Sequence, residues 1–312
     1  MKAAFKYIII WLAINTFAGV LVYFFGYIVA SILGYHFDGI KELVGHPWIT
    51  SFSLLLCDLL VLLVFWKMKY TRFGFNFGFT YGGDFSAKKL YLWAGVSAIG
   101  LLLFDVVSQF YLPIPEDPEI METLKQMMSN PVGIISVCVL GPISEEVIFR
   151  GAIERRLLEK NWNPWYAIVI SAIFFAVAHF NFAQGFTATI IGIFMGWVYY
   201  RTRSIWPCAL IHVVNNSVAT LMAAASPEAM YDENYVLPLS AGIPLFVLGI
   251  LLIIVAAYFI GKLTKDRTPI PVPVTEVLPP PLPVEATLGT PITVDEEPLP
   301  AEDVNDQLPP EF

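Results

Sequence analysis

The sequence is dominated by long blocks of apolar residues, most of them near or above the length that spans a bilayer. Eight blocks can be read, at about 7–34, 49–66, 91–112, 131–151, 165–182, 184–200, 205–225 and 243–261. A helix needs about 20 apolar residues to cross the hydrocarbon core, where its backbone polar groups must pair internally. At 57% hydrophobic and 14% charged residues, the composition excludes an ordinary soluble domain. We therefore predict an all-α polytopic membrane bundle of about eight transmembrane helices.

Lysine and arginine fall on alternate connections between these blocks. The N-terminus, 67–90, 152–164, 201–204 and the C-terminal segment hold 15 of the 18 basic residues. The opposite connections hold only Lys41 and Lys125, and Arg150 lies within a block. By the positive-inside rule both termini are cytoplasmic, and we expect a plasma membrane protein. The first block is too long for a signal-peptide core and is read as a retained helix.

The composition changes sharply at the C-terminal end. Residues 264–312 are rich in proline and hold 10 of the 26 acidic residues against two basic ones. Such a segment cannot bury enough apolar surface to fold, so we predict a disordered cytoplasmic tail. Two alternatives stay open for this tail, a plain solvated extension and a segment that binds a cytoplasmic partner.

The remainder is predicted to divide into three parts. The N-terminal transmembrane helices occupy 1–130, and a core of four helices occupies 131–220. An outer loop and the last helix follow at 221–263. Within the core, the basic stretch 154–160 is read as lying at the cytoplasmic surface. The G-x-x-x-G step formed by Gly192 and Gly196 is read as a site of close helix packing.

Three charged residues lie within six positions of the fourth block. Charges at membrane depth are costly and persist where they pair, line a cavity or do chemistry. In a helix Glu146 and Arg150 share a face and are predicted to form an ion pair that supports the structure. Glu145 is turned by about 100° from Glu146. Glu145 is therefore predicted to be the carboxylate that is free for chemistry.

Two histidines and an amide occupy later blocks at comparable depth. His179 lies in the block 165–182, whereas His212 and Asn216 lie four residues apart in the block 205–225. A lone histidine in an apolar helix is more often a packed core residue than a catalytic one. Together with a free carboxylate, the three residues indicate a water-activating acid/base set with hydrogen-bond donors. Glu145, His179, His212 and Asn216 are therefore the candidate catalytic residues.

These residues resemble the motifs of the CPBP intramembrane proteases, the CAAX protease and bacteriocin-processing (Abi) family. Its motifs EExxxR, FxxxH and HxxxN/D correspond here to Glu145–Arg150, Phe175–His179 and His212–Asn216. The resemblance covers roughly 131–220. It implies an intramembrane endopeptidase that cleaves a CAAX-like or membrane-bound peptide near the cytoplasmic face. It also implies water activation by Glu145 and His179, and oxyanion stabilisation by His212 and Asn216.

Whether a metal takes part stays open at this point. Glu145, His179 and His212 are residue types that make a three-ligand zinc site, although their spacing is not H-E-x-x-H. We favour chemistry without a cofactor. The three cysteines, Cys57, Cys138 and Cys208, fall inside apolar blocks and are read as packing residues.

Two other functions were weighed against the protease. The first is a catalytically idle family member that acts as a membrane scaffold or regulates a partner protein. The second is a proton-coupled transporter using Asp58, Asp105 and Glu145, for which an internal repeat is expected and none is visible. Nothing in the sequence indicates nucleic-acid binding.

Overall fold

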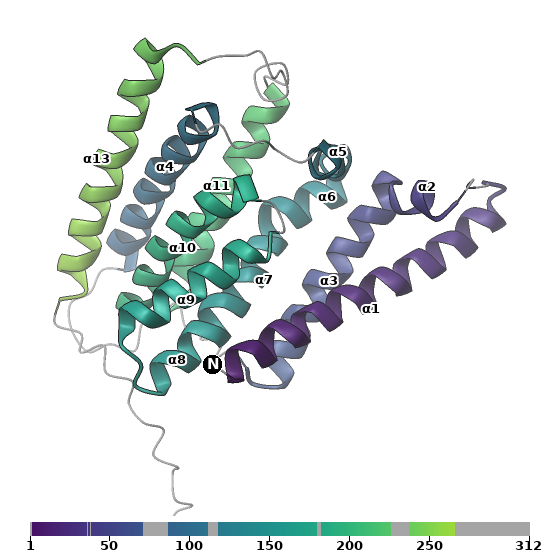
Figure 1. The fold of residues 1–312 in the computed structure, drawn as a ribbon, viewed down its shortest axis with the longest axis horizontal. Coiled ribbons are helices and arrows are strands. Elements are labelled where there is room, and N and C mark those ends of the chain that lie inside the picture. The colour runs from purple at the N-terminus through teal and green to yellow at the C-terminus, as the bar shows by residue number, and fades with distance from the viewer. Residues whose placement is uncertain are drawn as a thin grey trace, which may run out of the picture. The chain divides into compact units, whose positions relative to one another are not determined.

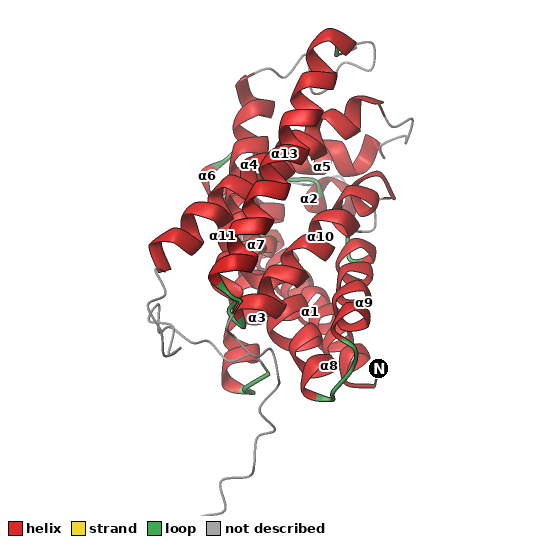
Figure 2. Cartoon of the chain, turned by 90° about the vertical axis from the view of Figure 1, so that its left-hand side faces the viewer, coloured by secondary structure: helices red, strands yellow, loops and turns green. Residues whose placement is uncertain are grey.

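The computed structural model describes residues 2–35, 37, 39–70, 87–111, 118–179, 182–225 and 237–265. Within these ranges the chain forms helices and no strands (Figure 2), which confirms the predicted all-α class. The described helices all belong to one unit, Met1–Pro271. Two predicted segments lie outside the described residues: the acidic tail from residue 266 onward, and residues 226–236 of the outer loop.

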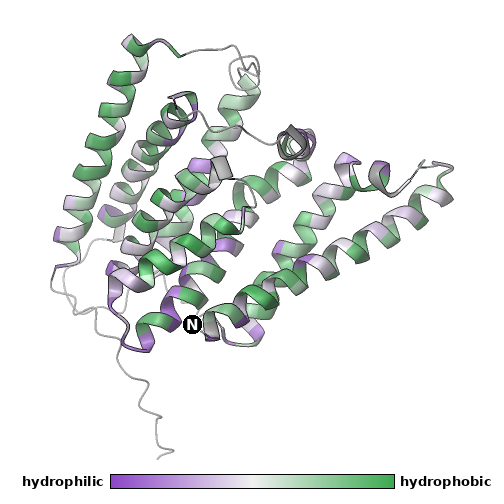
Figure 3. Ribbon diagram, viewed as in Figure 1, coloured by the Kyte–Doolittle hydropathy of each residue, from purple (hydrophilic) through white to green (hydrophobic). Residues whose placement is uncertain are grey.

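Six helical segments of the described chain are long and apolar enough to cross a membrane. They are α1 (Lys2–Ile32), α3 (Pro47–Lys67), α4 (Ala87–Tyr111), α11 (Ile205–Ala225), α13 (Leu239–Leu263) and the continuous run Pro131–Glu159. Large apolar side chains are exposed along α1 and α13, and the ribbon of α13 is almost wholly hydrophobic (Figure 3). Such surfaces are stable against lipid, so the chain is an integral multi-pass membrane protein.

The other two predicted segments are helices as well, but the first is shorter than predicted. They are α9 (Pro164–Val177) and α10 (Phe182–Thr202), which pack side by side. With 14 residues, α9 extends about 21 Å, less than the bilayer core of about 30 Å. The predicted boundary at 182 is wrong because hydropathy does not register the turn after Val177. There the N–H of His179 bonds the carbonyl of Ala176 and ends the regular helix.

Proline and asparagine mark where several of these helices begin. Pro47, Pro131 and Pro164 open α3, α6 (Pro131–Ile135) and α9, at positions where a missing N–H costs no helical bond. The side chains of Asn130 and Asn163 cap the last two helices by accepting from the N–H groups of Gly133 and Trp165. Two further helices, α2 (Ile40–Val44) and α5 (Pro118–Met127), follow α1 and α4.

The motif run is one continuous helix with two wider, π-helical segments. After α6 come η1 (Ser136–Leu140), α7 (Gly141–Glu146), η2 (Val147–Glu154) and α8 (Arg155–Glu159). Pro142 would clash with the preceding turn of a regular helix, and the wider η1 segment precedes it. The N–H of Gly141 bonds the carbonyl of Ser136, five residues back. The stretch 154–160 therefore starts as an extension of this helix rather than as a separate surface element, which corrects the reading given above.

Neighbouring helices hold the motif run from several sides. In Figure 1, α1 runs along α3 and α13 runs along α4. Gly100 and Gly249 let the last two backbones touch, because a Cβ on Gly249 would lie 2.9 Å from the Gly100 carbonyl oxygen. The motif run contacts α1 and α3, and it also contacts α9, α10 and α11. Residues from the N-terminal helices therefore meet the predicted core.

Candidate active site

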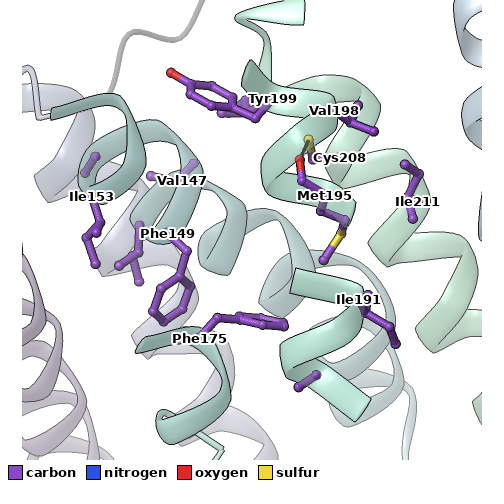
Figure 4. Close-up of a cluster of buried hydrophobic side chains, with 14 of the residues drawn as sticks. Val147, Phe149, Ile153, Phe175, Ile191, Met195, Val198, Tyr199, Cys208 and Ile211 are labelled. Carbon is purple, nitrogen blue, oxygen red and sulfur yellow. Dashed lines mark hydrogen bonds between the residues drawn. The ribbon is translucent and has the colours of Figure 1, made fainter. Parts of the chain in front are cut away.

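A buried apolar cluster fixes the motif run against the three helices that follow it. Figure 4 shows Val147, Phe149 and Ile153 of η2 beside Phe175 of α9, Ile191 and Met195 of α10, and Ile211 of α11. All of these side chains are at most 6% exposed. Close packing of this kind restricts side-chain rotamers, so the polar groups carried by the same helices are held in place.

The predicted ion pair between Glu146 and Arg150 is present. Arg150 Nη1 lies 2.7 Å from Glu146 Oε1, and both side chains are fully buried. Arg150 Nη2 also donates to the carbonyl of Gly192, and the guanidinium lies 4.7 Å from the ring centre of Phe175. The charge on Glu146 is thus neutralised inside the bundle, as the spacing predicted.

His212 links the two adjacent glutamates. Its Nδ1 lies 3.0 Å from Glu146 Oε1, and its Nε2 lies 3.6 Å from Glu145 Oε2. A carboxylate only accepts, so Nδ1 carries the hydrogen and donates to Glu146. In neutral His212, Nε2 is then an acceptor that faces Glu145. Sequence reasoning missed this bridge, because the contacts join residues 66 and 67 positions apart.

Glu145 is the accessible carboxylate of this group. Its side chain is 30% exposed, whereas that of His212 is 7% and that of Glu146 is 0%. Among the described residues no ion pair joins Glu145 to Arg150, in agreement with the angular argument. A small polar molecule reaching the site therefore meets Glu145 Oε2 and His212 Nε2 first.

His179 and Asn216 lie near this group but are engaged elsewhere. His179 sits in the turn after α9, where its Nδ1 donates to the carbonyl of Phe175 at 2.8 Å. The Phe175 ring makes edge contacts with both imidazoles, at 4.9 Å from His179 and 5.5 Å from His212. Asn216 donates one amide hydrogen to the carbonyl of Val137 in η1. The structure therefore brings Glu145 and His212 into contact and leaves His179 separated from His212 by a phenyl ring.

The residues do not fit the zinc site considered above. Within the described part of the chain, no group of three or more His, Cys, Asp or Glu residues is placed to hold a metal ion. Glu145, His179 and His212 are all described, and the Nδ1 atom of each histidine already has a protein partner. No step below is routed through a metal.

Two buried carboxylates beside the site were not singled out as part of it. Glu154 is fully buried, and its Oε2 would lie 2.9 Å from a Cβ placed on Gly196. The four-residue spacing of Glu146, Arg150 and Glu154 is the signal that places all three on one helix face. Asp58 of α3 is 3% exposed, and its Oδ1 lies 2.8 Å from Ser144 Oγ. No local pattern points to this second contact.

A cavity of about 450 Å³ lies between α1 and α3, next to Met127. Its polar lining includes Asn15, Ser53 and Cys57, and the Cys57 thiol donates to the amide oxygen of Asn15. None of the four candidate catalytic residues lines it. The cavity is therefore separate from the pair formed by Glu145 and His212.

The fold and this group of side chains define a polytopic membrane protein with an acid/base centre inside its helical bundle. Comparison with known proteins makes the class more specific. Residues 128–218 match the family described as Type II CAAX prenyl endopeptidase Rce1-like, and this segment belongs to that family. The match confirms the CPBP resemblance and contains every candidate catalytic residue.

One curated relative supports the same placement. The chain is 32% identical over 99 residues to a Bacillus subtilis (strain 168) protein named "Putative membrane peptidase YdiL". The aligned segment covers 32% of this chain and 40% of that relative, less than half the length of each. No solved structure matches the chain.

Proposed function

We propose that the protein is an intramembrane endopeptidase in which Glu145 and His212 act on one water molecule. The observation that carries this proposal is the 3.6 Å separation between Glu145 Oε2 and His212 Nε2 at the accessible end of an otherwise buried network. A water molecule can contact two acceptors at this separation. The family match and the name of the relative support proteolysis as the chemistry.

The hydrolytic step follows from these positions. Water gives one proton to Glu145, the general base, while its second hydrogen points to His212 Nε2. The hydroxide attacks the carbonyl carbon of the substrate, and the carbonyl oxygen becomes an oxyanion. Glu145 then returns the proton to the leaving amine as the C–N bond breaks. Every proton is accounted for by water, Glu145 and the products.

Other residues support this step in distinct ways. Glu146 accepts from Nδ1 of His212 and so keeps Nε2 directed at Glu145. Arg150 neutralises Glu146 and keeps it an acceptor. The resemblance assigns His179 to water activation and Asn216 to the oxyanion. The contact described above favours His212 over His179 as the first partner of Glu145, and Asn216 keeps a second amide hydrogen for the oxyanion.

The substrate is proposed to be a peptide or membrane-protein segment cleaved near the cytoplasmic face. This side follows from the distribution of lysine and arginine, which places both termini in the cytoplasm of a plasma membrane protein. A CAAX-like, prenylated peptide is the substrate class that the family name suggests. The competing proposal is an idle family member that serves as a scaffold for a partner.

The test uses purified protein in liposomes, with prenylated and unprenylated peptide libraries and mass spectrometry of the products. We expect cleavage by the wild type and none by Glu145→Gln. Glu159→Gln is a matched control, because Glu159 pairs with Arg155 and Arg156 away from the site. Equal cleavage by wild type and Glu145→Gln removes Glu145 from the mechanism. Absence of cleavage with both libraries favours the scaffold.

A further inference from the structure

Asp58 lies outside the segment that matches the protease family, yet its carboxyl group reaches the motif helix. It is carried by α3 and is 3% exposed. Its Oδ1 lies 2.8 Å from the hydroxyl of Ser144, the residue directly before Glu145. A buried polar contact between α3 and α7 therefore sits one peptide bond from the proposed general base.

The hydrogen count at Ser144 shows which group donates. The Ser144 Oγ lies within bonding distance of two oxygens, Asp58 Oδ1 at 2.8 Å and the Gly141 carbonyl at 2.9 Å. A hydroxyl has one hydrogen and two lone pairs, so it cannot donate fully to both. Both bonds form at full strength when Asp58 carries a hydrogen and donates it to Ser144. Ser144 then donates its own hydrogen to Gly141.

The surroundings of Asp58 agree with a neutral carboxylic acid. Its Oδ2 has no hydrogen-bond partner within the described residues, and no ion pair there includes Asp58. An unpaired charge buried at this depth is costly. Glu145 is close enough for the two charges to interact, so a second carboxylate charge would oppose ionisation of the base.

We propose that Asp58 is a positioning residue of the active site, acting through Ser144 on Glu145. In this arrangement Asp58 donates to Ser144, Ser144 donates to Gly141, and the two bonds fix the turn of α7 that presents Glu145. The proposal rests on the proposed endopeptidase function and extends the site to a helix of the N-terminal region. It requires a hydrogen-bond donor at position 58 rather than a negative charge.

Three variants separate these requirements. Asp58→Asn keeps the shape and supplies an amide donor, so kcat should stay within about threefold of the wild type. Asp58→Leu removes the donor, and Ser144→Ala removes its acceptor. Each should lower kcat by about tenfold or more with little change in KM, because misplacing a reacting group costs the chemical step. Cys57→Ala is the matched control, since Cys57 bonds Asn15 instead of the motif helix.

The first measurement is steady-state peptide cleavage in liposomes. The expected result is near-normal kcat for Asp58→Asn and Cys57→Ala, with reduced kcat for Asp58→Leu and Ser144→Ala. Normal kcat in Asp58→Leu overturns the proposal. Loss of activity in Asp58→Asn equal to that in Asp58→Leu also overturns it, because a negative charge would then be needed.

Two readouts do not depend on cleavage. Infrared spectra should show the carbonyl band of a protonated carboxylic acid that is lost in Asp58→Asn and kept in Cys57→Ala. Thermal melts of Asp58→Leu, Ser144→Ala and the double variant should be non-additive, because both changes break one link. If the wild type cleaves nothing, the endopeptidase proposal fails and these readouts decide whether the link exists. An unchanged band or additive losses overturn it.

Discussion

At the scale of single residues, the two adjacent glutamates have different environments although they share one histidine. Glu146 is fully buried and accepts from Arg150 and His212, whereas Glu145 keeps one third of its side chain exposed. A carboxylate with two buried donors is held in the charged form and in one rotamer. A carboxylate that faces only an acceptor nitrogen is free to take a proton.

The first prediction separates these two residues by stability and activity. Glu145→Gln should melt nearly like the wild type in detergent but hydrolyse no peptide, because only the basic oxygen is lost. Glu146→Gln should lose roughly 3–5 kcal/mol of stability, since it strands the buried Arg150 charge. The double variant Glu146→Gln with Arg150→Met should recover part of this loss. An unstable Glu145→Gln beside a folded, inactive Glu146→Gln reverses the assignment.

The second prediction concerns metal. Protein purified without added metal should cleave peptides at the full rate in chelator and contain much less than one zinc per chain. The reason is that Nδ1 of His179 and of His212 bonds protein oxygens, and no three-ligand group forms among the described residues. Elemental analysis beside the activity assay checks this. Loss of activity in chelator with recovery on adding zinc contradicts it.

The sequence predicted local pairs at this scale but not tertiary ones. Glu146 and Arg150 are four residues apart on one helix, so helical geometry alone pairs them. The contacts of His212 with both glutamates, and of Asp58 with Ser144, join different helices. Helical periodicity indicates which face a residue occupies, but not which helix packs against that face.

At the scale of helices, hydropathy located the segments but misplaced some ends. The block 165–182 includes a turn at His179, because residues around it are as apolar as those of α9. The π-helical segments η1 and η2 were not predicted at all. Pro142 is a local cause for the first of them, and such segments are frequent at functional sites.

The third prediction uses the glycines of α10, where the expected close packing is present. A Cβ on Gly192 would lie 3.1 Å from the Cβ and 3.3 Å from the Cα of Ala172. Gly192→Ala should therefore lower stability by about 1–3 kcal/mol and loosen the carbonyl that Arg150 bonds. Gly95→Ala is the control, because no atom lies within 4 Å of its Cβ position. It should raise stability by about 0.5–1 kcal/mol in thermal melts, and a similar loss in both variants contradicts the packing argument.

At the scale of the whole molecule, the membrane fold was predictable because lipid admits few alternatives. Backbone groups in a bilayer must bond within their own segment, so long apolar blocks become helices. The match over residues 128–218 confirms the region read as the protease core. The involvement of α3 in that core was not predictable, because the contact between Asp58 and Ser144 spans 86 positions of sequence.

The last prediction concerns which side of the membrane the site serves. Basic residues cluster on alternate connections, including the one after α8, so the termini should be cytoplasmic. A fluorescent reporter that folds only in the cytoplasm should fluoresce when fused after Lys265. A phosphatase that matures only outside should be active when inserted at Gly39 or Ser129, and inactive at Lys160. The opposite pattern would place the basic connections outside, and substrates would then reach Glu145 from the external side with the same chemistry.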